Sequence, residues 1–313
     1  MRYLKDLHEG DMISENYLCK TKQTLQTKMG KNYYSLTLQD KTASFDGKVW
    51  DLNAGIEHFE AMDYIRVEGQ VVSFQGALQL NIRRIRKLSE GEYDPVEYMP
   101  STKKDIAVMF KELLGFIGEV KDPYLRKLLE SFFVEDKEFV KKFKMHSAAK
   151  NVHHGFLGGL LEHTVGVAKL CRYLAEAYPV LDRDLLLTAA IFHDIGKVEE
   201  LSAFPENDYT DEGSLLGHIY MGTEWIGEHI AKIPGFPVKR KHELQHCILA
   251  HHGELEYGSP KKPAIVEALA LSMADNLDAK LETMTELFDS SEEKGWLGFQ
   301  RLFDSNIRRT TGK

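Results

Sequence analysis

Cysteine is scarce in this chain of 313 residues, and its scarcity excludes two kinds of site. The three cysteines, Cys19, Cys171 and Cys247, stand far apart, so the sequence offers neither a disulfide framework nor closely spaced thiols for a zinc knuckle. Isolated thiols of this kind are usually buried and reduced, as in proteins of a reducing compartment. We therefore expect a cytoplasmic protein.

Long apolar runs are also missing. The longest, residues 185–192 and 264–274, fall short of the roughly 18 residues that a membrane helix needs. Residues 1–11 are charged throughout and do not resemble a signal peptide. The sequence therefore predicts no membrane partner, and its length suggests two domains at about 150 residues each.

An excess of positive charge is absent as well. The net charge of −8 argues against a general binder of polyanions. The charge is uneven, because residues 1–90 carry 13 basic and 12 acidic residues, which leaves 27 (40 − 13) basic and 36 (48 − 12) acidic residues in the remainder. An acidic domain can still bind phosphate groups if metal ions lie in its cleft.

Residues 11–88 show the alternating pattern of β-strands. Tyr34, Leu36 and Leu38 alternate with polar neighbours, and similar segments recur up to Ile82, with turn residues between them. A short helix-like insert is expected at residues 55–62. Four or five strands with one interposed helix predict a small closed barrel of the OB-fold type.

Helix breakers and polar residues crowd residues 89–103, and from there the pattern is helical to the end of the chain. We expect Ser101 or Thr102 to cap one helix, and Asp122 followed by Pro123 to begin another. The prediction is a two-domain protein with an N-terminal all-β barrel at residues 1–90, a linker at 91–103 and a C-terminal all-α domain at 104–313.

Histidine and aspartate stand on the apolar faces of several predicted helices. Each lies at helical spacing from leucine, isoleucine, valine or alanine, as His163 does from Val167. The set comprises His163, His193, Asp194, His251, His252 and Asp275, together with His218 between Gly217 and Ile219.

Each member of this set has an ordinary explanation when taken alone. A lone histidine such as His163 is usually a hydrogen-bonded core residue, and Asp275 alone could be a helix cap or half of an ion pair. The ordered series within 113 positions (163 to 275) is different, because buried polar groups are costly unless they are paired or bind metal. The sequence therefore predicts that several helices converge on a metal site.

The motifs resemble a known superfamily. His193-Asp194-Ile195-Gly196-Lys197 resembles the signature of the HD superfamily of metal-dependent phosphohydrolases. Residues 151–164 are similar to the YhaM family of 3′→5′ exoribonucleases, in which an OB-fold precedes an HD domain, and residues 33–50 resemble OB-folds of the nucleic-acid-binding class. This resemblance covers nearly the whole chain, and it implies a hydrolase that acts on RNA.

The resemblance also implies a ligand set for two divalent metal ions. His163, His193, Asp194 and Asp275 would hold the first ion, and Asp194 would bridge to a second ion held by His218, His251 and His252. Whether His251 and His252 are both ligands stays open. The resemblance favours manganese, while iron and zinc also suit mixed histidine and carboxylate ligands. A third ion would require a glutamate where Gly159 stands, so we expect two.

The implied reaction is two-metal hydrolysis of single-stranded RNA to nucleoside 5′-monophosphates. Asp194 and Lys197 are the predicted catalytic residues, with Lys197 contacting a phosphate oxygen. The alternative for Lys197 is a surface lysine near a helix end. Lys150, His153 and His154 would line the substrate entrance, unless they belong to a solvated loop.

The barrel would bind single-stranded substrate through base stacking and backbone charge. Trp50 is expected on its exposed face, and Arg83 opens the basic run that ends at Lys87. Trp50 could instead pack against the helical domain, and the basic run could be an ordinary strand end.

Two other functions stay open at this point. The first is an HD phosphohydrolase that acts on small nucleotides or cyclic dinucleotides, although the Gly-Tyr-Pro loop expected of the latter is missing after His252. The second is a non-catalytic protein that binds single strands. The sequence does not decide between RNA and single-stranded DNA, and a homo-oligomer is compatible with it.

Overall fold

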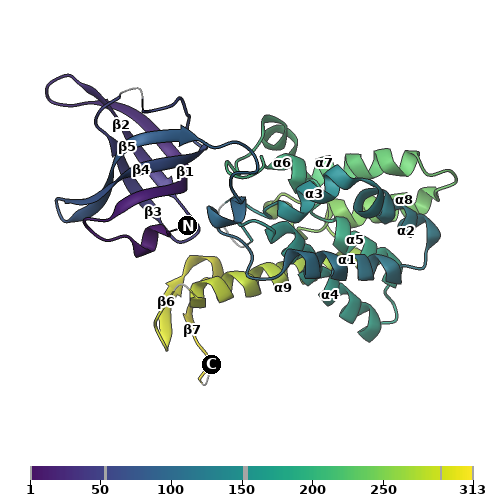
Figure 1. Cartoon of the computed structure of the whole chain (residues 1–313). Helices are drawn as coiled ribbons and strands as arrows, with labels where there is room; N and C mark the ends of the chain where they lie inside the picture. The colour runs from purple at the N-terminus through teal and green to yellow at the C-terminus, as the bar shows by residue number, and fades with distance from the viewer. Residues whose placement is uncertain (1, 53–54, 151–153, 290, 312–313) are drawn as a thin grey trace. The chain divides into compact units, whose positions relative to one another are not determined.

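The computed structural model describes residues 2–52, 55–150, 154–289 and 291–311 (Figure 1). The chain divides into two compact units, one made of Met1–Ser101 with Phe204–Glu206, the other of Thr102–Ala203 with Asn207–Lys313. The domain boundaries at 90 and 103 stay a prediction. No helix among the described residues is long and apolar enough to cross a membrane.

The first unit is a closed five-stranded barrel, as predicted. Its strands follow the order β1-β2-β3-β5-β4, and β1 closes the barrel by pairing with β4. All pairs are antiparallel except β3 with β5. The strands are β1 Met12–Gln26, β2 Asn32–Gln39, β3 Ser44–Val49, β4 Tyr64–Phe74 and β5 Ala77–Lys87, and a 3-10 turn, η1 Leu4–Asp6, precedes them.

The alternating pattern of the sequence predicts which side chains form the barrel core. Leu36 and Leu38 of β2 are buried in it, while their polar neighbours face outward. The long strand β1 shifts register between Cys19 and Thr21, and such an irregularity bends a strand so that it can pair on both sides. The period-two pattern therefore identified the inward face correctly.

The segment 55–62 is not a helix, contrary to the prediction. Ile56 forms a parallel bridge with Ile85 of β5. Backbone hydrogen bonds of 3.0 Å also run from Ile85 to Gly55 and from Glu57 to Ile85. The backbone N–H and C=O groups that a helix would bond internally are therefore hydrogen-bonded to β5. Phe59 is buried in the barrel core.

The second unit is helical up to residue 289. Four of its helices begin at an aspartate whose side chain accepts backbone N–H groups, namely Asp105, Asp122, Asp136 and Asp182. The elements are α1 Ile106–Glu119, α2 Pro123–Glu130, the π-helical turn η3 Ser131–Glu135, α3 Lys137–Met145, α4 Gly159–Ala177, α5 Arg183–Phe192, α6 Lys197–Glu200, α7 Asp211–Ala231, α8 Val238–Leu249, η4 Leu255–Tyr257 and α9 Val266–Asp289.

The predicted caps are right at one helix and wrong at another. Asp122 caps α2 ahead of Pro123, as expected. Neither Ser101 nor Thr102 caps α1, because Asp105 accepts from the backbone there. The Thr102 hydroxyl instead donates to the carboxylate of Glu162.

Helix α5 forms the centre of the helical unit. Every residue from Leu185 to Phe192 is buried, and the helix contacts α2, α4, α8 and α9. A helix that is apolar on all sides must be surrounded by other elements. His193 and Asp194, which follow directly after it, therefore emerge in the interior of the unit.

The chain after α9 forms a hairpin, so the expectation of helices to the end is wrong for its last residues. Strands β6 (Trp296–Gln300) and β7 (Ser305–Arg308) pair across the turn η5 (Arg301–Phe303). The turn requires a left-handed residue, and Asp304 adopts it with φ 46°. The guanidinium of Arg309 donates to the carbonyls of Phe288 and Ser291 and so holds the hairpin to the end of α9.

Candidate metal centre

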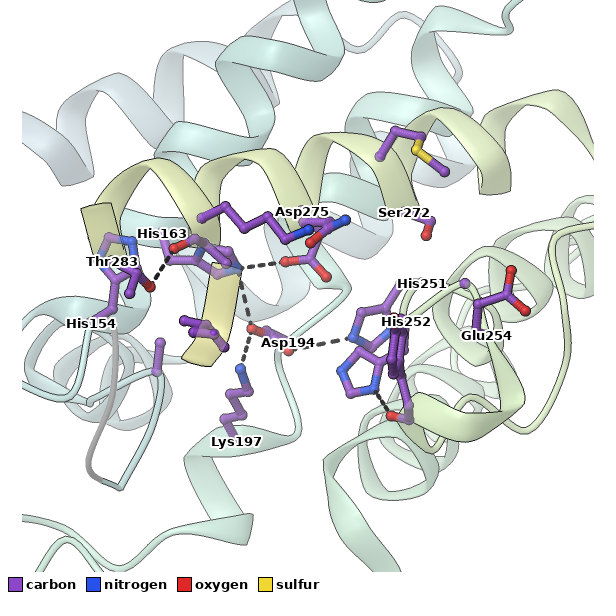
Figure 2. Close-up of a pocket in the computed structure, with 18 residues that line it drawn as sticks. His154, His163, Asp194, Lys197, His251, His252, Glu254, Ser272, Asp275 and Thr283 are labelled. Atoms are coloured by element: carbon purple, nitrogen blue, oxygen red, sulfur yellow. Dashed lines mark hydrogen bonds and ion pairs between the residues drawn. The ribbon is translucent and has the colours of Figure 1, made fainter. Parts of the chain in front are cut away.

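Four predicted ligands meet at one point of the helical unit, among them His163, Asp194 and Asp275 in Figure 2. The Nε2 atom of His163 on α4 lies 3.1 Å from His193 Nε2 and 3.1 Å from Asp275 Oδ1 on α9. Asp194 Oδ2 lies 3.5 Å from the Nε2 atom of each of these two histidines. Metal–ligand bonds of about 2.0–2.2 Å place neighbouring donor atoms at such separations, so this group suits one ion.

The other oxygen of Asp194 faces a second group. Its Oδ1 atom lies 3.5 Å from His218 Nε2 and 3.6 Å from His251 Nε2. His218, His251 and His252 each offer a ligand atom within 4.8 Å of the others. Asp194 therefore stands between the two groups, with one oxygen toward each (Figure 2).

The five histidines share one hydrogen-bonding pattern. Each uses Nδ1 for a hydrogen bond to a backbone carbonyl or a carboxylate, which fixes the ring and leaves Nε2 for a ligand. The partners are Asp278 for His163 (2.8 Å), Ala190 for His193 (2.8 Å), Glu200 for His218 (2.9 Å), Ile248 for His251 (2.6 Å) and Tyr257 for His252 (2.9 Å).

Three polar atoms at the centre lack hydrogen-bond partners among the described residues. Asp194 Oδ1, His218 Nε2 and His251 Nε2 are all buried without one, although they face one another. Buried polar atoms are rarely left unpaired, because each costs about 1–3 kcal/mol. A cation shared by these three atoms would satisfy them all, so the residues fit a divalent metal.

The electrostatics favour a cation. Burial raises the pKa of Asp194 and Asp275, yet their cationic and hydrogen-bonded neighbours outweigh it and hold both pKa values well below the ordinary range. Burial lowers the pKa of His193 to about 4, so its ring is neutral near pH 7 and can act as a ligand. For His163, burial lowers the pKa, but Asp275 and Asp278 outweigh it and raise the pKa to about 10, so without an ion its ring carries a proton that a bound metal ion would displace.

Sequence reasoning missed two carboxylates that orient ligands. Asp278 lies three residues after Asp275 on α9 and accepts from His163, and Glu200 lies three residues after Lys197 and accepts from His218. Gly217 interrupts α7 with φ 74°, and the backbone N–H of His218 also donates to Glu200 at 2.9 Å. Both carboxylates lie one helical turn from a predicted site residue, but this spacing alone does not separate them from surface carboxylates.

A glycine allows Asp278 to approach α4. A Cβ atom at Gly166 would lie 2.2 Å from Asp278 Oδ1. We therefore expect Gly166→Ala to displace Asp278, loosen His163 and reduce metal affinity or activity by about 10- to 100-fold. Metal titration and a rate assay measure the effect.

Gly115→Ala on α1 is the matched control for this variant. A Cβ atom there meets nothing within 4 Å. At an exposed helical position alanine is more stabilising than glycine by up to about 1 kcal/mol. Gly115→Ala should therefore be more stable than the unsubstituted protein and keep its activity. Full activity in Gly166→Ala would contradict the role given to Asp278.

A cavity of about 420 Å³ opens at the centre. Lys197 lines it, and its Nζ atom lies 2.6 Å from Asp194 Oδ2. His154 also lines it but is buried, with Nε2 3.3 Å from Asp278 Oδ2. Lys150 is not part of the lining and pairs with Asp208, and His153 lies outside the described residues.

The two predicted barrel residues lie together in the first unit. Trp50 is 40% exposed and stacks on Tyr33, with ring centroids 4.5 Å apart. Its indole N–H donates to Asn81 at 3.1 Å. Trp50 and Arg83 line the same hollow of the barrel, so the structure brings an aromatic face and a guanidinium to one surface.

Comparison with known proteins agrees with this geometry. The model of the HD domain family matches residues 160–280. The 3′-5′ exoribonuclease YhaM of Bacillus subtilis is 36% identical over 284 residues, which cover 89% of this chain and 88% of the relative. The matched HD region contains all seven predicted ligands.

Solved structures resemble a smaller part of the chain. The second OB-fold domain of replication protein A from Methanococcus maripaludis is 22% identical, covers 29% of this chain and 98% of that domain, and has a TM-score of 0.23. A replication protein A heterotrimer bound to single-stranded DNA is 15% identical, covers 28% of this chain and 65% of that one, and has a TM-score of 0.22.

Proposed function

This chain belongs to the family of the 3′-5′ exoribonuclease YhaM, and on that premise we propose that it is a metal-dependent hydrolase that shortens single-stranded RNA from the 3′ end to nucleoside 5′-monophosphates. We propose single-stranded DNA as a second substrate. The observation that carries the proposal is the buried carboxylate of Asp194, with one oxygen toward each ligand group. A carboxylate in this position suits a bridge between two cations beside a phosphodiester.

The donor atoms suit two divalent ions. His163, His193, Asp194 and Asp275 would hold one ion, and Asp194, His218, His251 and His252 would hold the other. Histidine mixed with carboxylate suits manganese, iron or zinc better than calcium or magnesium, and we propose manganese. When bound, such ions stabilise charge on the phosphate and ease the deprotonation of water.

Lys197 complements the ligands from the cavity wall. Asp194 holds its ammonium group at 2.6 Å, and burial opposes the charge while Asp194 raises the lysine pKa above its usual value. A charge fixed there can bind a non-bridging phosphate oxygen while a water oxygen bonds to phosphorus, the bond from phosphorus to the penultimate 3′-oxygen breaks, and that oxygen takes up a proton. The terminal nucleotide then leaves with its 5′-phosphate. We also propose that His154 contacts the substrate from the same wall.

On the barrel we propose that Trp50 and Arg83 hold the incoming strand. The indole presents an exposed face that Tyr33 supports from behind, and Arg83 beside it can bind a phosphate. A base stacked on an aromatic ring contributes about 1–3 kcal/mol, so Trp50→Ala should weaken RNA binding by roughly 5- to 150-fold. Fluorescence anisotropy with labelled single strands measures it.

A second variant and the salt dependence of binding provide controls for this prediction. Trp50→Phe keeps a ring at the position and should recover most of the affinity. The affinity of the unsubstituted protein should fall as salt rises, because phosphate contacts release counterions. Unchanged RNA affinity in Trp50→Ala would remove the barrel surface from the proposal.

We propose a cytoplasmic location for the enzyme. The three cysteines are free and buried, which suits a reducing compartment. Cell fractionation with an antibody against the chain tests this.

The function is tested with 5′-labelled single-stranded RNA and DNA of the same sequence, incubated with purified protein and Mn²⁺. We expect a ladder of labelled products that shorten stepwise from the 3′ end, and nucleoside 5′-monophosphates by chromatography. A cyclic dinucleotide and a free nucleotide are assayed in parallel.

The outcomes separate the candidate functions. Cleavage of only the small nucleotides would show an HD phosphohydrolase of another specificity. RNA binding without any hydrolysis in Mn²⁺, Fe²⁺ or Zn²⁺ would show a non-catalytic binding protein. Labelled mononucleotide as the first product would reverse the proposed direction.

A further inference from the structure

Part of the cavity lining holds no predicted metal ligand. On α9, Met273, Asn276 and Lys280 face the cavity at spacings of three and four residues, which place them on one side of the helix. Tyr257 lines it from the short helix η4, and Leu302 from the turn of the C-terminal hairpin. Three separate segments therefore extend the cavity beyond the ligand atoms.

The dimensions of this extension limit what it can hold. The cavity volume of about 420 Å³ lies near the lower end of the roughly 300–1,000 Å³ that small-molecule sites occupy. Lys280 lies five residues beyond Asp275, which corresponds to about 7.5 Å along the helix axis. A phosphate at the metal centre would therefore leave room along α9 for one sugar and one base.

Part of the cavity lining consists of large, exposed apolar side chains. Tyr257, Met273 and Leu302 are 69%, 58% and 58% exposed, so large apolar groups stand open to the cavity. Such groups at a cavity wall are typical of a binding site rather than of a protein surface. They offer an aromatic ring and two flexible apolar side chains to a planar base.

Two polar members of the lining, Asn276 and Lys280, are available for a ligand. Within the part of the chain that the structure describes, neither Asn276 nor Lys280 has a side-chain hydrogen bond or ion pair. Lys197, the other lysine of the lining, is already paired with Asp194. Lys280 thus supplies to the cavity a positive charge that no described residue pairs.

We propose that this extension is the subsite of the 3′-terminal nucleotide, an inference that rests on the proposed exoribonuclease function. Tyr257 stacks on the terminal base, with Met273 and Leu302 against its edges. Lys280 and Asn276 donate hydrogen bonds to the sugar of the same nucleotide, whose 5′-phosphate lies at the metal centre. The site therefore binds a nucleoside 5′-monophosphate, the product, in the position that the terminal residue of the substrate occupied.

The test uses AMP as the probe and a diribonucleotide as a substrate too short to depend on a distant surface. The Mn²⁺-loaded full-length protein is compared with Lys280→Met, which keeps the length of the side chain, and with Tyr257→Ala. We expect each change to raise the inhibition constant of AMP and the KM of the dinucleotide about tenfold, with kcat altered less than about threefold. Metal content should be unchanged.

Two control variants are measured beside Tyr257→Ala and Lys280→Met. Tyr257→Phe keeps the ring and should restore binding. Lys239→Met removes another exposed lysine, from α8 and outside the cavity lining, and should leave both constants unchanged. Circular dichroism confirms folding, which is expected to survive because both test residues are exposed.

The possible outcomes separate this inference from the function on which it rests. If the unsubstituted protein shortens RNA while Lys280→Met and Tyr257→Ala keep their AMP and dinucleotide constants, the subsite is overturned and the function stands. If either variant loses metal, its residue acts through the centre, which also overturns the subsite. If RNA is not shortened but AMP binding falls in both variants, the proposed function fails while the nucleotide site stands.

Discussion

Asp194→Asn is expected to reduce RNA degradation by on the order of 10³-fold or more. Its two oxygens face different ligand groups, at 3.5 Å from His193 Nε2 and 3.5 Å from His218 Nε2. The asparagine side chain has the same shape but carries no negative charge, and its nitrogen cannot serve as a second ligand atom. Losing a ligand common to both ions removes several kcal/mol of charge stabilisation, and each 1.36 kcal/mol is tenfold in rate.

Elemental analysis should show that the same variant binds less than the full complement of metal. Lys197→Ala gives the contrasting case, because Lys197 contacts Asp194 and no other predicted ligand within hydrogen-bonding distance. That variant should keep its metal and turn over about 10²- to 10³-fold more slowly, the typical effect of losing one donor to a charged transition state.

Folding controls are needed because Asp194 is buried beside a lysine. Loss of the carboxylate leaves the Lys197 ammonium without its partner, but this side chain is 17% exposed and can turn toward solvent. Circular dichroism should therefore show a folded protein in both variants. Full activity in Asp194→Asn would end the two-ion interpretation, and metal loss in Lys197→Ala would show that Lys197 supports the ligands instead.

The ligand set could be predicted because a buried helical face shows in the sequence as apolar residues at helical spacing. A histidine that repeats with leucine and valine on one helical face must point inward, as His163 does, and a buried polar side chain needs a partner. The structure brings the six other predicted residues together around Asp194. Their roles as ligands stay a proposal, since convergence is what the geometry establishes.

The residues that orient the ligands could not be found in the same way. Asp278 and Glu200 are hydrophilic residues on helices that also carry solvent-facing charges, so the pattern does not separate them from surface carboxylates. Their importance comes from distances between elements far apart in sequence, such as the approach of Asp278 to Gly166 across α4 and α9. Such distances follow from packing and not from periodicity.

The two errors in the fold have a similar origin. Residues 55–62 contain apolar side chains at helical spacing, but Ile56 pairs with Ile85, and that contact with a distant strand outweighs local preference. The C-terminal hairpin depends on a single left-handed residue, Asp304, and on bonds from Arg309 to the end of α9. In both places tertiary contacts decided the backbone conformation.

Removing divalent ions with a chelator is expected to stop RNA degradation and to lower the melting temperature of the helical unit. Without an ion, Asp194 Oδ1, His218 Nε2 and His251 Nε2 stay buried and unpaired. An ion that binds only the folded state at 100 times its dissociation constant adds about 2.7 kcal/mol of stability. For a unit of this size, each kcal/mol shifts the melting temperature by about 2–4 °C, so one site should contribute roughly 5–10 °C.

Differential scanning calorimetry of the chelated protein, before and after addition of Mn²⁺, measures this shift, and the RNA assay is run on the same samples. The transition of the barrel should not move, because every predicted ligand lies in the helical unit. Asp194→Asn provides the matched control and should show a smaller shift on addition of Mn²⁺, since neither ligand group remains complete. Activity that persists after all metal has been removed, or a melting temperature that does not respond to Mn²⁺, would mean that Asp194 and its histidines form a polar core and not a metal centre.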